Sequence, residues 1–239
     1  MADTAQDAAG IGPLADDLAV AALAAARRFG GGGTMWCWSS GPAGHGHHVA
    51  VEFVHPVIVG KRALPAVVVD GGDAVSVLRP LVRSHDIILI VDAPWSDSGV
   101  RSALRRAKAW GALTIWIGAG ERPEPGEADH VLWVGGDPEL AGYDGRYVLL
   151  YHLLWELTHV CFEHPGLLHP PRDCDGPVCT TCSDEGRLAE VVRAVSMSAT
   201  ARTPDGLEEV DTSICGPLEP GDLILVHAGT ALTIVDLPA

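Results

Sequence analysis

Residues 86–120 read DIILIVDAPWSDSGVRSALRRAKAWGALTIWIGAG. The run DIILIVDAP (86–94) has almost no polar residue inside it, which is typical of a strand covered on both faces of a sheet. SDSGVRSALRRAKAWG (96–111) predicts a helix, because serine and aspartate open it and a glycine ends it. ALTIWIGAG (112–120) predicts another buried strand. A strand, a helix and a strand in this order indicate a right-handed crossover in a parallel sheet.

The same alternation extends on both sides of this unit. We expect further helices over residues 14–29, 74–82 and 146–164, and further strands over 34–40, 64–72 and 128–136. Residues 49–54 (VAVEFV) fit either a strand or a buried helix. The pattern predicts an α/β domain in which a parallel sheet lies between two layers of helices.

The pattern changes after a proline-rich segment. LAEVVRAV (188–195), EEVDTS (208–213), GDLILVHAG (221–229) and ALTIVD (231–236) are short strand candidates separated by glycine and proline, which predicts a small all-β barrel. The expected organisation is a disordered start (1–13), an α/β domain (14–165), a linker (166–178) and a barrel (179–239).

Composition excludes some partners. The 239-residue chain carries a formal charge of −15, which argues against nucleic acid and anionic membranes, because both attract clustered lysine and arginine. No signal peptide and no apolar run of ~18 residues is visible, so we expect a cytoplasmic protein with reduced thiols. Cys37 and Cys161 lie in apolar surroundings and are expected to be buried structural thiols.

The order of segments resembles a known family. SSGPAGHGHHVAVEF (39–53), the 86–120 unit and YHLLWELTH (151–159) are similar to the phosphate loops and last helix of sugar isomerase (SIS) domains, above all the phosphoheptose isomerases. The resemblance implies that Ser40, Ser96 and Ser98 contact a substrate phosphate.

The phosphate loops depart from the family pattern. Pro42 stands where the family has a serine, and it removes both a hydroxyl and an amide donor. Asp92 and Asp97 lie in the second loop and would repel a phosphate. We therefore expect little phosphoheptose isomerase activity.

The resemblance also implies a divalent-metal site. His48 and Glu52 match two family ligands, and at i and i+4 they share one helix face. His152 matches a third ligand, and Asp144 stands where the family has a glutamine. The simpler alternatives are that His45, His47 and His48 form a solvated loop and that His152 is a core histidine. His159, His164 and His169 are expected at the surface or in the linker.

The last part of the chain resembles a different family. GDLILVHAGTALTIVD (221–236) is similar to the signature of HypC/HupF, the small chaperones of nickel-iron hydrogenase maturation. That resemblance implies a scaffold for iron bearing CN and CO ligands. It implies two partners, the hydrogenase large-subunit precursor and a HypD-like maturation protein. Candidate iron contacts are Cys182, then Cys179, then Cys174, with His227 nearby.

A zinc site is the alternative for the same thiols. Cys174, Cys179 and Cys182 with Cys215 or a histidine would supply four ligands for a zinc knuckle. The sequence thus leaves iron and zinc open.

The leading hypothesis is a hydrogenase maturation factor in which a degenerate SIS-like domain is fused to a HypC-like barrel, with no enzymatic role in the barrel. The alternative is a metal-dependent sugar-phosphate isomerase of phosphoheptose type with an accessory tail. A metal-delivery protein is a third possibility. We expect a homo-oligomer formed through the SIS-like domain.

Overall fold

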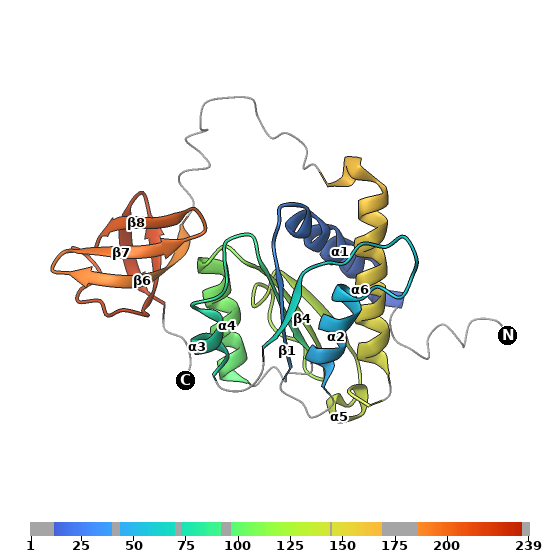
Figure 1. Cartoon of the computed structure of the whole chain (residues 1–239). Coiled ribbons are helices and arrows are strands. Elements are labelled where there is room, and N and C mark those ends of the chain that lie inside the picture. The colour runs from blue at the N-terminus through green and yellow to red at the C-terminus, as the bar shows by residue number, and fades with distance from the viewer. Residues whose placement is uncertain are drawn as a thin grey trace.

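The computed structural model describes residues 12–39, 44–69, 73–91, 97–143, 145–168 and 186–235. These residues form two layered units, a parallel sheet flanked by helices and a closed β-barrel (Figure 1). The expected parallel α/β architecture and the small β unit are both present. The exact domain boundaries expected from the sequence stay a prediction.

The sheet has five parallel strands in the order β2-β1-β3-β4-β5. Their bounds are β1 Met35–Ser39, β2 Ala66–Val69, β3 Ile87–Val91, β4 Leu113–Ala119 and β5 His130–Val134. The helices are α1 Ala15–Gly30, α2 His45–Val54, α3 Ala74–Leu78, α4 Ser98–Ala109, α5 Pro138–Ala141 and α6 Arg146–Glu163, with 3-10 turns η2 Gly12–Leu14 and η3 Pro165–Leu167.

Both faces of the sheet are buried, as the apolar strands require. In β3, Ile87 and Leu89 pack against the layer of α1, α2 and α6. Ile88 and Ile90 point the other way, into the layer of α3 and α4. The two-residue period of a strand therefore divides one apolar run between two cores.

One element that the sequence left open is now assigned, and two others differ from the sequence prediction. Residues 49–54 are helical and complete α2. The helix expected over 74–82 ends at Leu78, because Pro80 has no N–H with which to continue the hydrogen bonds of the helix. The short α5 was not predicted at all.

The barrel has the closed strand order β10-β8-β7-β6-β9. Its strands are β6 Arg187–Val195, β7 Ser198–Thr203, β8 Gly206–Asp211, β9 Leu223–His227 and β10 Thr230–Ile234. The sequence prediction missed β7, whose inward residues include Ala199 and Ala201. Alanine packs well in a narrow barrel but carries little strand propensity.

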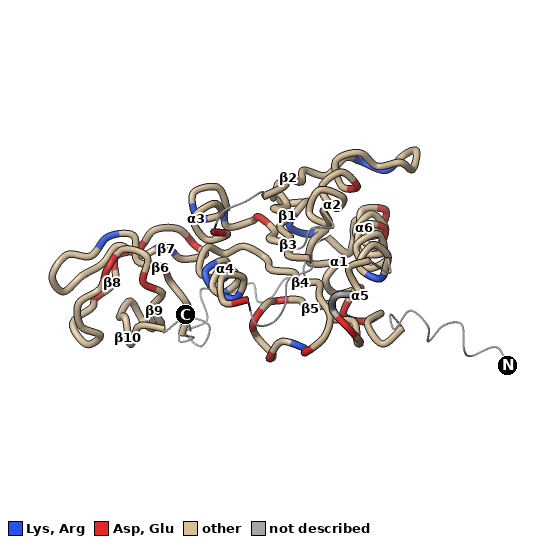
Figure 2. Tube along the Cα trace, turned by 90° about the horizontal axis from the view of Figure 1, so that it is seen from below, with Lys and Arg blue, Asp and Glu red and all other residues tan. Residues whose placement is uncertain are grey.

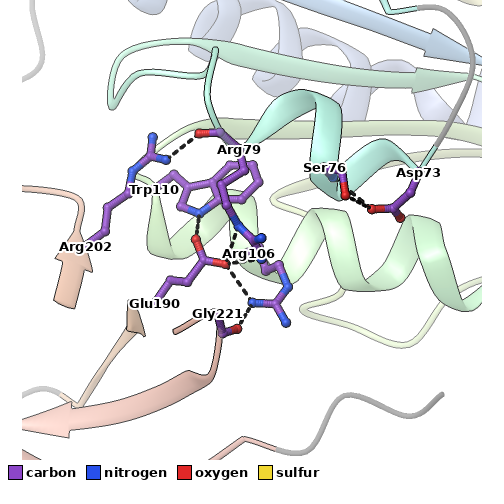
Figure 3. Close-up of polar contacts among 8 residues, drawn as sticks. All are labelled: Asp73, Ser76, Arg79, Arg106, Trp110, Glu190, Arg202 and Gly221. Atoms are coloured by element: carbon purple, nitrogen blue, oxygen red, sulfur yellow. Dashed lines mark hydrogen bonds and ion pairs between the residues drawn. The ribbon is translucent and has the colours of Figure 1, made fainter. Parts of the chain in front are cut away.

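The barrel docks on α3 and α4 through one buried carboxylate. Figure 2 shows α4 between the barrel and the sheet, and Figure 3 shows the contacts. Glu190 of β6 accepts hydrogen bonds from Arg79 (2.8 Å), Arg106 (2.8 Å) and the indole N–H of Trp110 (2.7 Å). Arg202 of β7 stacks on Trp110 and donates to the Arg79 carbonyl oxygen at 2.9 Å.

Apolar packing accompanies these polar contacts. Leu223 of β9 is buried in the same core as α3 and α4. The barrel and the α/β unit therefore share an interface with its own hydrophobic contacts.

Within the described residues, no helix is long and apolar enough to cross a lipid bilayer.

Candidate metal centre

The candidate site lies at the carboxyl edge of the sheet. β1 runs into α2, and β1 pairs with β2 on one side and β3 on the other. The helices that follow these strands lie on opposite faces, since α2 belongs to one core and α3 and α4 to the other. Ligands of open α/β sheets bind at such a switch point.

Two helices of one layer bring three ligand-type side chains together at this edge. His48 and Glu52 occupy the first and second turns of α2, and His152 lies in the second turn of α6. α2 lies beside α6 and contacts it (Figure 1). Nε2 of His48 lies 3.3 Å from Oε1 of Glu52, and Nε2 of His152 lies 3.6 Å from the same oxygen.

These distances fit a small divalent ion. With bonds of ~2.05 Å, ligand atoms of a tetrahedral zinc are about 3.3 Å apart. One ligand atom from each residue lies within 4.8 Å of the other two. Two imidazoles and a carboxylate suit zinc, nickel or iron(II), and three protein ligands leave a position for water or substrate.

The site is open to solvent on one side and packed on the other. The side chains of His48 and His152 are 42% and 45% exposed, and that of Glu52 is 20% exposed. A small molecule can therefore reach all three. On the packed side, the His48 ring meets Tyr151 edge-on, with centroids 5.2 Å apart. Burial, with a smaller contribution from Glu52, raises the pKa of the Tyr151 hydroxyl well above its usual range.

Tyr151 and His45 are the residues that sequence reasoning missed. The Tyr151 hydroxyl lies 2.7 Å from Nδ1 of His48 and 3.5 Å from Nδ1 of His45. His45 is 4% exposed, whereas the sequence placed it in a possible solvated loop. The available signal was spacing, because His45, His48 and Glu52 at i, i+3 and i+7 share one helix face.

Several predicted site residues lie outside the described residues. These are Ser40, Ser96, Asp144, Cys174, Cys179 and Cys182, together with Pro42 and Asp92 of the departing loops. Ser98 is described and opens α4, where it is partly buried. His227 ends β9 and pairs with Thr230 across a tight turn. Their roles therefore stay predictions.

Asp97 has a structural role at the second loop. Its carboxylate caps α4 by accepting the Val100 N–H at 3.0 Å. Helix N-termini attract anions through their free N–H groups. An aspartate in this position offers its own negative charge to those groups and so disfavours a phosphate there.

Other histidine and cysteine predictions have clear outcomes. His159, expected at the surface, is buried at 2% exposure and contacts the carbonyl oxygens of Trp155 and Arg62. That prediction was wrong because α6 packs this turn against the segment before β2. Cys37 and Cys161 are buried as expected, and burial raises the pKa of both thiols.

Comparison with solved structures supports an assignment of the fold. A phosphoheptose isomerase from Francisella tularensis superposes with a TM-score of 0.53 at 17% identity, over 63% of this chain and 89% of that one. A Bacteroides fragilis protein described as a phosphosugar isomerase involved in capsule formation gives 0.53 and 17%, over 66% and 85%. The N-terminal region has an SIS-like fold. No protein-family model and no curated protein matches the sequence.

The hydrogenase-maturation prediction is wrong. The two solved structures compared above are described as isomerases of phosphosugars, and nothing supports a HypC/HupF barrel beside the SIS-like region. The run that suggested HypC/HupF is explained locally as the β9–β10 hairpin. Its turn residues, Ala228 and Gly229, have φ values of 48° and 78°. An alternating apolar run followed by such a turn is needed by any small barrel.

Proposed function

We propose that the SIS-like region is a metal-dependent sugar-phosphate isomerase and that the barrel is an accessory unit. The observation that supports this most directly is the convergence of His48, Glu52 and His152 at the carboxyl edge of the sheet. The likeness in fold to phosphosugar isomerases agrees with it.

The chemistry of the side chains suits an aldose–ketose isomerisation. That reaction takes a proton from one carbon next to a carbonyl and returns it to the neighbouring carbon. A divalent ion held by His48, Glu52 and His152 supplies Lewis-acid polarisation of a substrate oxygen. Glu52, through the carboxylate oxygen that does not hold the ion, can carry the proton, as carboxylates do in general acid–base catalysis.

Substrate choice follows from the phosphate loops. Asp97 at the amino end of α4 and Pro42 in the first loop depart from a phosphate-binding pattern. We therefore expect slow turnover of sedoheptulose 7-phosphate. Other phosphosugars, whose phosphate meets the loops differently, are the expected substrates.

The test is an isomerase assay on the full chain loaded with zinc, nickel or iron(II). A panel of pentose, hexose and heptose phosphates is supplied, and aldose–ketose conversion is followed by NMR. We expect metal-dependent conversion of at least one member. Glu52→Gln should lower the rate by ~10²-fold or more, because it removes both a ligand and a base. The exposed Glu163→Gln at the far end of α6 serves as the matched control. Metal-loaded protein that converts no sugar phosphate would overturn the proposal.

A further inference from the structure

A cavity lies at the boundary between the barrel and the α/β unit, on the opposite face of the sheet from α2 and α6. It has a volume of about 240 Å³ and is lined by residues 202–207 of the barrel and by Ser84 and Trp110 of the α/β unit. Its floor is buried, since Trp110 and Thr203 are 1% and 3% exposed. Its rim, the turn between β7 and β8, is exposed. Small-molecule sites occur preferentially at boundaries of this kind.

Arg202 brings a positive charge to this cavity. Its guanidinium stacks on the Trp110 ring at 5.1 Å and donates to the carbonyl oxygen of Arg79 at 2.9 Å (Figure 3). It also donates to the carbonyl oxygen of Val82. Both acceptors are neutral, and within the described part of the chain no carboxylate lies within ion-pair distance of Arg202.

Glu190 does not neutralise Arg202. Its two oxygens already accept hydrogen bonds from Arg79, Arg106 and the Trp110 indole. Three guanidinium groups therefore meet near one carboxylate. Burial lowers the pKa of the Arg202 guanidinium below its ordinary value, while Glu190 opposes this lowering and Arg79 adds to it. A half-buried cation without its own counter-charge is costly, so a negative group that enters the cavity would be favourable.

A negative charge lies at the rim of the same cavity. Asp205 is exposed in the turn between β7 and β8, and among the described residues its carboxylate has no hydrogen-bond or ion-pair partner. A simple anion would be attracted by Arg202 but repelled by Asp205. A molecule that carries both a carboxylate and an ammonium group satisfies both residues.

The remaining walls indicate the size and the side chain of such a molecule. Pro204 and Leu207 offer apolar surface, and the Ser84 hydroxyl can donate or accept a hydrogen bond. At about 240 Å³ the cavity is smaller than the ~300–1,000 Å³ sites that take drug-sized ligands. One cation, one anion and an apolar wall in so small a volume match a free amino acid.

We propose that this cavity binds a free α-amino acid with an apolar side chain. Its carboxylate pairs with Arg202 and its ammonium group with Asp205. Its side chain packs against Pro204 and Leu207. The ligand contacts both units at once, because Ser84 belongs to the α/β unit, and binding therefore strengthens the docking of the barrel. The site is separate from the metal centre and does not depend on the proposed isomerase activity.

The first experiment is isothermal titration calorimetry of the full chain with leucine, valine and methionine. Two analogues of leucine each lack one charge, since N-acetyl-leucine has no ammonium group and leucine amide has no carboxylate. We expect leucine to bind and to raise the unfolding temperature. Each analogue should bind about fivefold more weakly or worse, which is the loss expected for one ion pair at a wet site. Inorganic phosphate, the probe for a simple anion site, should bind more weakly than leucine.

Asp205→Asn tests the rim charge with little risk to the fold, because Asp205 lies in an exposed turn. The variant should bind leucine about fivefold more weakly and N-acetyl-leucine at least as tightly as wild type does. Glu219→Gln is the matched control, since it removes one negative charge from an exposed position of the barrel outside the cavity. It should change neither affinity.

Four results would overturn the proposal. The wild-type chain might bind none of the three amino acids, bind N-acetyl-leucine as tightly as leucine, or prefer inorganic phosphate. The fourth result is a folded Asp205→Asn variant that binds leucine as tightly as wild type. Each of them leaves the metal centre and the isomerase proposal unaffected, because those are tested with metal ions and sugar phosphates.

Discussion

Asp97 carries a charge at the place where the fold would receive a substrate anion. Its carboxylate already satisfies the Val100 N–H, and it stands at the start of the helix that follows β3. Asp97→Ser keeps a good helix cap, because serine and aspartate are comparable at that position. The substitution should therefore leave stability within about 0.5 kcal/mol.

The same change should improve the binding of phosphorylated sugars. Removing one negative charge near a phosphate is worth about 1 kcal/mol at a wet site, or roughly a fivefold lower KM. Steady-state kinetics with a phosphosugar and thermal unfolding check the two effects together. An unchanged or higher KM in a normally stable variant would show that the phosphate does not approach α4.

At the residue scale, the sequence predicted which three side chains come together better than it predicted the residues packed around them. His48 and Glu52 are recognisable because four-residue spacing places them on one helix face. His152 lies about a hundred residues further along the chain, and only its resemblance to a family pattern linked it to them. Tyr151 and His45 were not predicted, because the contacts that they make depend on how α2 packs against α6 and on the position of the Gly142 carbonyl.

At the element scale, the turn of the β9–β10 hairpin contains an alanine in an unfavourable backbone conformation. Ala228 has φ 48°, a left-handed conformation that costs residues with a Cβ about 1 kcal/mol, and Gly229 follows at 78°. Two central residues with positive φ suit a tight hairpin turn, for which glycine or asparagine is preferred. Ala228→Gly should therefore stabilise the protein by about 0.5–1 kcal/mol in urea denaturation.

A glycine placed in a strand provides the matched control. Ala194→Gly in β6 should destabilise by about 0.5–1 kcal/mol, because a strand interior gains nothing from glycine's freedom. If both substitutions lower stability alike, the turn conformation described for Ala228 is incorrect.

At the element scale, apolar runs were the reliable signal. Every strand of the parallel sheet was anticipated, because strands buried on both faces are nearly free of polar residues. β7 was missed since its SATART sequence has only alanine as inward apolar residue. The end of α3 was placed too late because the missing N–H of Pro80 was not weighed.

At the scale of the whole molecule, Glu190 connects the barrel to the α/β unit. This 3%-exposed carboxylate is held by two arginines and an indole from the α/β unit. Glu190→Gln leaves Arg79 and Arg106 without their counter-charge, and breaking a buried pair in this way costs about 3 kcal/mol. We expect a lower unfolding temperature and, in calorimetry, separate transitions for barrel and α/β unit in place of a single one.

Glu208→Gln is the control for that experiment. Glu208 pairs with Arg187 within the barrel, and both side chains are about a third exposed. Exposed pairs contribute ~0–1 kcal/mol, so this variant should unfold nearly as wild type. Two well-separated transitions already present in the wild type would refute a shared interface held by Glu190.

The sequence pattern did not predict that the barrel packs against the α/β unit. Glu190 lies in a mostly apolar strand and its partners lie 80 or more residues upstream, so the contact exists only once both units are folded. Tertiary contacts are equally invisible in residues 221–236, so a run that forms the β9–β10 hairpin suggested a hydrogenase chaperone.

The central claim is that His48, Glu52 and His152 hold one divalent metal ion. The most direct measurement is a crystal structure of the full chain grown with Co²⁺ or Zn²⁺, with anomalous scattering recorded at the metal edge. The account predicts one strong anomalous peak per chain, ~2.0–2.2 Å from Nε2 of His48, a carboxylate oxygen of Glu52 and His152. Crystals soaked in the metal that show no peak there, or a peak held by other residues, would contradict it.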